Sequence, residues 1–347
     1  MGGSMLKRMP FFFLSLVVVA CDSSPSGPNG DDNGAIDTSR ISSSVLLDHL
    51  NFLAADSLYG RRAGSEHERR SAEYLRDRFV EYGLEPGAPD YFQEFTITVS
   101  VDGQTGLVSQ NVLGVLAGEG SLAGQWVILG AHYDHLGYVS GSDPLIVYNG
   151  ADDNASGTTL MLEIARYLSE YFSDGTHGEP DRRSIMFQAY GAEEVGLVGS
   201  FYFCGQPTVV MDSVVAMVNL DMVGRLRDDA LGLIGLSSSP DWTSALAGAN
   251  TESLSLTVVE GLLNRSDQYC FYQHQRPVLF LHTGLHPEYH TPLDDVALIN
   301  EEGMVRIGNF AINAMLNLAH SFDRLQFATG SLPFDTAMAD LRLVPVH

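Results

Sequence analysis

The sequence predicts an α/β fold in which helices sandwich a mixed, largely parallel central sheet. Apolar, strand-like runs alternate along the chain with amphipathic helical segments, and this alternation is typical of parallel sheets with helices on both faces. The strand-like runs also stop repeatedly at His, Asp or Glu, where open α/β sheets place their ligand sites. The composition does not change after about residue 40, so we expect one folded domain over residues 41–325 and a C-terminal extension over residues 326–347.

The N-terminal part of this domain is predicted to be helical. Residues 41–58 and 65–83 carry apolar side chains at helical spacing, and Ser65 and Gly83 suit the start and the end of the second helix. Residues 91–101 alternate like a strand. Residues 111–120 and 125–137 are then expected to form a pair of strands joined by a turn.

The remaining segments repeat the alternation of helix and strand. We expect an amphipathic helix first, then three buried strands, and finally a long closing helix. In chain order these cover residues 155–172, 182–192, 214–224, 276–284 and 300–322.

The N-terminus predicts export and lipid attachment. Residues 1–20 place Lys7 and Arg8 before an apolar run that is too short to span a bilayer, as in a signal peptide. The run ends in "VVAC", which resembles a bacterial lipobox and implies cleavage before Cys21 and acylation of that cysteine. Residues 21–40 are rich in Ser, Pro, Gly, Asn and Asp, which predicts a flexible tether. We therefore expect a protein lipid-anchored to the bacterial cell envelope, on a periplasmic or outer surface.

The charge balance excludes some partners. The 347 residues contain 19 Lys and Arg against 43 Asp and Glu, whereas nucleic acids and anionic membrane surfaces need a basic face. The acidity is compatible with cation binding and equally with solubility or salt adaptation. Two cysteines follow Cys21, and neither has metal-site spacing, so Cys204 and Cys270 are left as either a disulfide or two thiols.

Candidate site residues follow the predicted strands. They are histidines and carboxylates throughout: His132, Asp134, Glu193, Glu194, Asp221 and, in a loop, His290. The neighbouring Asp152 and Asp153 are also explained as helix caps, and His290 as an ordinary loop histidine. Asp221 interrupts an apolar run, where a carboxylate without a counter-charge would be costly.

These residue types indicate a metal centre. Two histidines and three carboxylates suit a pair of divalent cations such as zinc, with one carboxylate between both. His132 and Asp134 lie two apart on extended chain and so face the same way, which lets Asp134 accept the second N–H of the imidazole. His135 is a competing ligand, but the same alternation predicts that it faces the other side.

Five stretches, in this order, resemble the M28 metallopeptidases, a family of two-zinc aminopeptidases and their relatives. They are "HYDHLG", "NGADDNASG", "AYGAEEVGLVGS", "NLDMVGR" and "HPEYHTPLDD". The resemblance spans about residues 42–322 and implies the zinc-peptidase, phosphorylase/hydrolase-like fold. It implies one zinc on His132 and Asp221, a second on Glu194 and His290, and Asp153 bridging both, with a cis peptide bond before Asn154. It also makes Glu193 the general base and Asp134 the carboxylate that orients a ligand.

The function that the resemblance implies is that of an exopeptidase, most often an aminopeptidase, which hydrolyses peptides through a metal-bridged hydroxide with Glu193 as the base. Two alternatives are a single-zinc acyltransferase like the glutaminyl cyclases and a non-catalytic binding lipoprotein on the same fold. One departure is Gln268, which stands where family members often carry histidine. Tyr269 and Tyr289 are both candidates for a side chain that stabilises the oxyanion, and Arg225 suits either a substrate carboxylate or an acidic neighbour.

Overall fold

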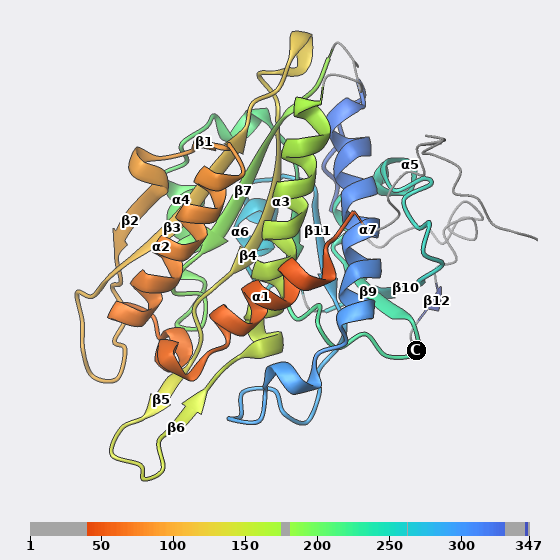
Figure 1. Ribbon diagram of the computed structural model, residues 1–347. Helices are drawn as coiled ribbons and strands as arrows, with labels where there is room; N and C mark the ends of the chain where they lie inside the picture. The colour runs from red at the N-terminus through yellow and green to blue at the C-terminus, as the bar shows by residue number, and fades with distance from the viewer. Residues whose placement is uncertain (1–39, 175–180, 262, 330–343, 346–347) are drawn as a thin grey trace, which may run out of the picture. The chain divides into compact units, whose positions relative to one another are not determined.

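The computed structural model describes residues 40–174, 181–261, 263–329 and 344–345 (Figure 1). The predicted signal peptide, Cys21 and nearly all of the predicted tether lie outside these residues, as does most of the extension over residues 326–347. The domain boundaries and the lipid anchor therefore stay predictions. Among the described helices, none is both long enough and apolar enough to cross a bilayer.

A mixed sheet runs through the middle of the domain, as the sequence predicts. Its strand order is β1-β3-β7-β4-β8-β11-β9-β10-β12, with β2 paired to β3. The bounds are β1 (Glu85–Pro86), β2 (Phe92–Thr96), β3 (Val108–Leu116), β4 (Trp126–His132), β7 (Ser184–Tyr190), β8 (Val214–Leu220), β9 (Ala230–Ile234), β10 (Ser255–Val259), β11 (Val278–His282) and β12 (Val344–Pro345). The four central strands β7, β4, β8 and β11 are mutually parallel. The neighbours β3 and β9 run antiparallel to them.

Helices cover both faces of this sheet (Figure 1). Their bounds are α1 (Ser43–Leu53), α2 (Glu66–Glu81), α3 (Gly157–Ser173), α4 (Val198–Gly205), α5 (Trp242–Ala245), α6 (Gln268–Gln273) and α7 (Glu301–His320). In Figure 1, α1, α2, α3 and α7 lie in front of the sheet, and α4 and α6 lie behind it. The predicted cap is confirmed, because the Ser65 hydroxyl accepts the N–H of Glu68 at the start of α2.

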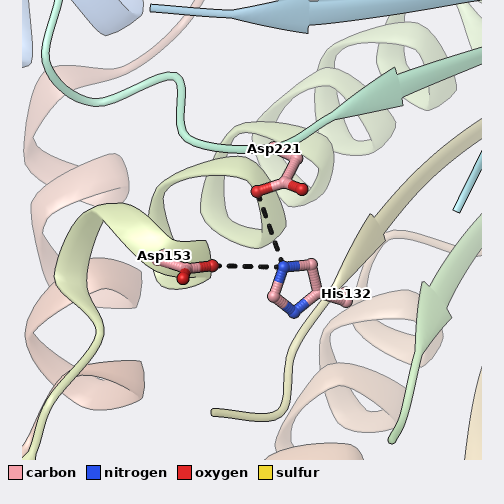
Figure 2. Close-up of side chains that lie close together, drawn as sticks. All are labelled: His132, Asp153 and Asp221. Atoms are coloured by element: carbon pink, nitrogen blue, oxygen red, sulfur yellow. Dashed lines mark ion pairs between the residues drawn. The ribbon is translucent and has the colours of Figure 1, made fainter. Parts of the chain in front are cut away.

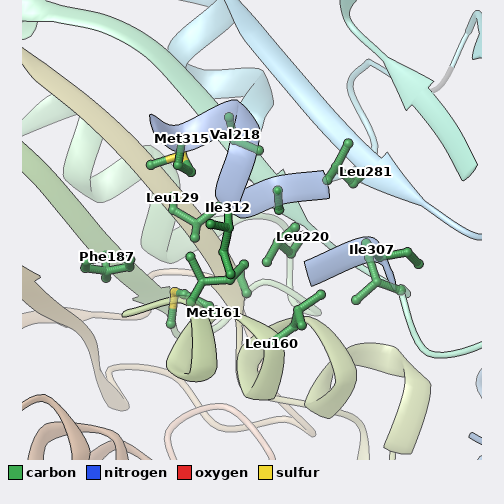
Figure 3. Close-up of a cluster of buried hydrophobic side chains, with 14 of the residues drawn as sticks. Leu129, Leu160, Met161, Phe187, Val218, Leu220, Leu281, Ile307, Ile312 and Met315 are labelled. Carbon is green, nitrogen blue, oxygen red and sulfur yellow. The ribbon is translucent and has the colours of Figure 1, made fainter. Parts of the chain in front are cut away.

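Alternate side chains of the central strands fill two cores. In β4, Val127, Leu129 and Ala131 belong to the core beneath α3 and α7, whereas Ile128 belongs to the core beneath α4 and α6. Figure 3 shows the first core, in which Leu129 and strand side chains of β8 and β11 meet Leu160 and others from α3 and α7. Because both faces of these strands are buried, the sequence reads there as continuous apolar runs.

Two features of the sheet differ from the sequence prediction. Residues 111–120 and 125–137 do contribute β3 and β4, but β7 lies between them, so they are not a hairpin. The connection over residues 117–125 is longer than a tight turn and can cross over one intervening strand. The strand predicted over residues 91–101 ends at Thr96. Beyond it, Ile97 still donates its N–H to Leu107 O at 2.7 Å, and an isolated bridge then joins Val101 to Gln104.

Some elements were not predicted from the sequence. The strands β9 and β10 extend the sheet beyond β11, and a separate hairpin of β5 (Gly137–Val139) and β6 (Ile146–Tyr148) follows the end of β4. The helices α4 and α6 are joined by a disulfide between Cys204 and Cys270. The pairing that the sequence left open is therefore present, and it ties together the two helices on one face of the sheet.

Candidate metal centre

The carboxyl ends of the parallel strands meet at one edge of the sheet, and the predicted site residues gather there. His132 is the last residue of β4 and Asp221 directly follows β8. Figure 2 shows the His132 ring between two carboxylates. Its Nε2 atom lies 3.3 Å from Asp153 Oδ1 and 3.5 Å from Asp221 Oδ1. The ligand atoms of these three residues lie within 4.8 Å of one another, and all three residues are buried.

A second group forms on the other side of Asp153. His290 Nε2 lies 3.0 Å from Asp153 Oδ2 and 3.3 Å from Glu194 Oε2. His290 occupies a left-handed backbone conformation (φ 57°), and its ring stacks on Tyr289 with the centroids 3.8 Å apart. Asp153 thus contacts a histidine from each group, one with each carboxylate oxygen.

His135 also belongs to this second group, which corrects the prediction that it faces the other side. Its Nδ1 atom lies 2.7 Å from Glu194 Oε1, and the ligand atoms of His135, Asp153 and Glu194 lie within 4.8 Å of one another. The strand alternation fails here because β4 ends at His132. Beyond that point the chain bends, and the N–H of His135 donates to Arg61 O instead of continuing the ladder.

Asp134 is buried and holds the turn that carries the two glutamates. Its two carboxylate oxygens accept the backbone N–H groups of Glu193, at 2.9 Å, and Glu194, at 3.2 Å. Asp134 Oδ1 lies 3.8 Å from His132 Nδ1, so it faces the imidazole without a direct hydrogen bond. The aspartate therefore fixes the backbone of the glutamate pair and supplies negative charge behind the histidine.

A second carboxylate fixes the loop that presents Asp153. Asp294 accepts the backbone N–H groups of both Asp152 and Asp153 through its carboxylate, at 3.0–3.1 Å. The peptide bond between Asp153 and Asn154 is cis. Asp152 does not share the position of Asp153, because its Oδ2 lies 3.2 Å from His286 Nε2 and its Oδ1 accepts the N–H of Gly224. Neither aspartate acts as a simple helix cap.

Arg61 joins the two segments that bear these ligands. The buried guanidinium donates to the carbonyl of Tyr133, at 2.7 Å, and to those of Asn149 and Gly150, at 2.7 and 3.0 Å. Burial lowers its pKa to about 10, although the negative charges of Asp134, Asp153 and other carboxylates of the site act to raise it. Arg61 is thus a fixed positive charge beneath the acidic cluster.

The electrostatics of the site separate the two adjacent glutamates. Burial raises the pKa of Glu193 well above its usual range; Asp267 and Glu194 add to this, although His132 opposes it. For Glu194, burial and the charge of Asp153 also act to raise the pKa. Hydrogen bonds from His135 and His290 outweigh these effects, and the pKa is lowered. Glu193 is therefore suited to accept a proton and Glu194 to stay ionised.

Asp267 is a further carboxyl group that the sequence did not single out. It is fully buried, and neither of its oxygens has a hydrogen-bond partner among the described residues. Burial raises its pKa to about 7, and Asp221 adds to this while His132 opposes it. It immediately precedes Gln268, whose side chain accepts from Asn219 within the same buried region. In the sequence, the departure at Gln268 is the feature that drew attention to this segment.

The donor set fits divalent metal ions. Each of the two groups offers a histidine nitrogen and carboxylate oxygens, which are the ligands that zinc prefers. Asp153 belongs to both groups, so one carboxylate is placed to bridge two cations. The Nε2 atoms of His132 and His290 both face Asp153, at 3.3 and 3.0 Å from its carboxylate oxygens. Two cations would offset a cluster of carboxylates that otherwise repel one another.

Comparison with known proteins agrees with this centre. The sequence model of Peptidase family M28 matches residues 111–315, more than half of the chain. Aminopeptidase YwaD of Bacillus subtilis is 30% identical over 237 residues, which are 64% of this chain and 48% of that protein. The chain thus spans about half the length of this curated relative.

Two solved structures share the fold. A zinc aminopeptidase from Bacillus subtilis superimposes with a TM-score of 0.66 at 18% identity, covering 81% of this chain and 96% of that one. A glutaminyl cyclase from Porphyromonas gingivalis gives a TM-score of 0.62, also at 18% identity, over 81% of this chain and 99% of that one. The fold prediction is therefore confirmed, and it is common to two kinds of enzyme.

Proposed function

Because this chain belongs to Peptidase family M28, we propose that it is a zinc-dependent aminopeptidase that hydrolyses N-terminal residues from peptides. The observation that carries the proposal is the position of Asp153, shared between two groups of ligand-type side chains. The partly exposed Glu193 stands next to one of these ligands in sequence. A two-metal site with an adjacent base is an arrangement that can hydrolyse an amide.

We assign the ligands from the contacts. His132 and Asp221 would hold one zinc ion, Glu194 and His290 the other, and Asp153 would bridge them. The assignment of His290 over His135 is supported by their surroundings, since His290 lies in a loop with its side chain 36% exposed, whereas His135 is buried. In this arrangement His135 keeps its 2.7 Å contact with Glu194 and orients that carboxylate.

The residues of the chain divide the chemistry between them. When bound, the two zinc ions would polarise the peptide carbonyl and lower the pKa of a water molecule. Glu193 accepts the proton of that water as it attacks the carbonyl carbon, and then donates the proton to the leaving amine. The raised pKa of Glu193 suits both transfers. Asp134 holds the amide of Glu193 at 2.9 Å and so fixes the base relative to the ligands.

The charge of the site supports recognition of the N-terminus of the peptide. The carboxylates of Asp221 and Asp267 lie close enough to Glu193 to raise its pKa, and such a field attracts an ammonium group and repels a C-terminal carboxylate. Arg225 is the cation next to Asp221, but its guanidinium donates to Glu288 at 2.9 Å. It is therefore already paired with an acidic neighbour. The names of relatives such as YwaD agree with this preference.

We also propose that the enzyme acts outside the cytoplasm as a lipid-anchored protein. The support is the sequence alone: a short apolar run that ends at Cys21, followed by a polar segment up to residue 40. The disulfide between Cys204 and Cys270 agrees with an oxidising compartment. Labelling of cells with a radioactive fatty acid tests the anchor, since Cys21→Ser would lose the label while the wild-type chain keeps it.

The alternative function is that of a single-zinc acyltransferase, favoured by the similarity in fold to a glutaminyl cyclase. Metal content separates the two. We expect two zinc ions per chain at saturation, and a limit of one zinc per chain with cyclisation of an N-terminal glutamine would establish the alternative.

The decisive experiment compares zinc-loaded protein on free-amine dipeptides and on the same dipeptides with a blocked N-terminus. We expect hydrolysis of the free-amine series, loss of turnover in Glu193→Ala with both zinc ions retained, and full activity in the control Glu302→Ala, which changes an exposed residue of α7. Cleavage of the blocked series alone would refute the aminopeptidase proposal. Undiminished turnover in Glu193→Ala would refute the role of the base.

A further inference from the structure

The turn that carries the two glutamates is bound by two buried carboxylates. Three successive backbone N–H groups point at them: that of Ala192 toward Glu68, at 3.2 Å, and those of Glu193 and Glu194 toward Asp134, at 2.9 and 3.2 Å. Ala192 has a left-handed backbone conformation (φ 56°), which an alanine adopts only when its surroundings enforce it. The glutamate pair is therefore held through its backbone from outside the turn.

Glu68 comes from a distant part of the chain. It lies in the first turn of α2, where Ser65 caps its N–H, and it is 124 residues away in sequence from Ala192. Its Oε2 atom accepts the N–H of Gly64 at 2.6 Å. Its Oε1 atom accepts both the hydroxyl of Ser109, at 2.6 Å, and the N–H of Ala192. One side chain thus links α2, β3 and the turn after β7.

No ion pair holds Glu68 in its place among the described residues. The side chain is 1% exposed, and no lysine, arginine or histidine of the described residues forms an ion pair with it. A buried carboxylate is costly unless its oxygens are hydrogen-bonded. Here three donors converge on the two oxygens, so hydrogen bonds and not a counter-charge hold this side chain in place.

The carboxylate of Glu68 packs closely against the turn. A Cβ atom added to Gly191 would lie 2.5 Å from Ser109 Oγ and 2.8 Å from Glu68 Oε1. On the other side, Ala63 and Ala192 belong to a small apolar cluster with Phe95. Glu68 is therefore in direct contact with the segment that precedes Glu193.

We propose that Glu68 is a positioning residue that sets the direction of Glu193 by holding the amide of Ala192. The inference rests on the proposed function, because it concerns the geometry of the base in that reaction. Glu68 itself does not contact the ligands or the substrate. Its effect is to keep the base in line with the reacting atoms, where small displacements cost one to two orders of magnitude in rate.

The test is Glu68→Gln, with Glu163→Gln as the matched control. Glu163 is also a fully buried glutamate; it accepts the N–H of Ser42 at 2.9 Å and pairs with Arg166, away from the metal centre. We expect Glu68→Gln to lower kcat about tenfold to a hundredfold with little change in KM, and to retain two zinc ions per chain. Amide hydrogen exchange at residues 192–194 should accelerate. Glu163→Gln should change neither kcat nor exchange at these residues.

Ser109→Ala provides a second variant if Glu68→Gln does not fold. It removes one of the three donors and leaves the carboxylate in place, so we expect a smaller loss of kcat and a smaller increase of exchange at residues 192–194. An unchanged kcat together with unchanged exchange in either folded variant would overturn the role of Glu68. Wild-type protein without hydrolytic activity would instead overturn the proposed function, and the exchange measurement would still report whether Glu68 holds the turn.

Discussion

Asp134→Asn tests how the metal centre is held together, because this buried aspartate binds the amides of both Glu193 and Glu194. An asparagine side chain can accept only one of these two N–H groups, and its own NH₂ group then faces the other. The change removes one hydrogen bond to a charged group, about 1.5–3 kcal/mol, and leaves a buried N–H unpaired, about 1–3 kcal/mol. We therefore expect the zinc-loaded protein to lose about 2.5–6 kcal/mol of unfolding free energy.

In protein treated with a chelator, Asp134→Asn should cost less unfolding free energy. Asp134 is a like charge for the neighbouring carboxyl groups and contributes to the raised pKa of Glu68. Removing its charge relieves this repulsion when no zinc is bound. Loss of a carboxylate behind a metal ligand typically weakens metal binding about tenfold to a hundredfold, so the stabilisation by zinc should shrink by about 1–3 kcal/mol.

The assay is urea unfolding with and without zinc, combined with a chelator competition that measures zinc affinity. Asp241→Asn is the control, since Asp241 Oδ2 also accepts a backbone N–H, that of Gln326 at 2.7 Å, but far from the ligands in the fold. The control should leave zinc affinity unchanged. A folded Asp134→Asn protein with wild-type zinc affinity and wild-type kcat would refute the reasoning.

Two further predictions concern stability away from the metal centre. His49 is buried between the hydroxyls of Tyr74 and Tyr82, at 2.6 and 2.9 Å, and burial, with the charges of nearby arginines, lowers its pKa from 6.5 to about 4. Between these two pKa values the unfolded chain binds more protons than the folded chain. The stability contributed by His49 is therefore complete above pH 6.5 and is lost as the pH falls through 4. From pH 7 to 4.5 the free energy of unfolding should fall by about 2 kcal/mol. Urea unfolding of wild type and His49→Gln across this range should show the difference, and parallel pH profiles would contradict it. The disulfide between Cys204 and Cys270 closes a loop of 66 residues, so the double change to serine should cost about 4 kcal/mol of unfolding free energy, whereas an equal midpoint in wild type with and without reductant would speak against it.

The sequence determined the central sheet and the kind of site at its edge. Apolar runs buried on both faces identify β4, β7, β8 and β11 wherever they lie in the chain, because burial on two sides requires continuous apolar side chains. The residues after these runs include His132 and Asp221, whose side chains the structure places 3.5 Å apart. This was predictable because the carboxyl ends of parallel strands share one edge.

Predictions from the local sequence pattern were wrong where the backbone stops being regular. The strand alternation that places His132 and Asp134 on one side predicted that His135 faces the other side. That prediction was wrong because β4 ends before His135. The predicted pairing of β3 with β4 was wrong for a similar reason, because no local pattern shows that β7 lies between them. Both depend on which distant segment supplies the next hydrogen bond.

Only the tertiary structure identified the groups that hold the ligands in place. Glu68 appears in sequence as an ordinary residue in the first turn of a helix, and Arg61 as a loop cation, yet each contacts a segment more than 70 residues away. Their roles arise from converging backbone donors and acceptors, which leave no local trace in composition or periodicity. The chemistry of this site was thus present in the sequence, whereas the geometry that makes the chemistry possible was decided by contacts between distant elements.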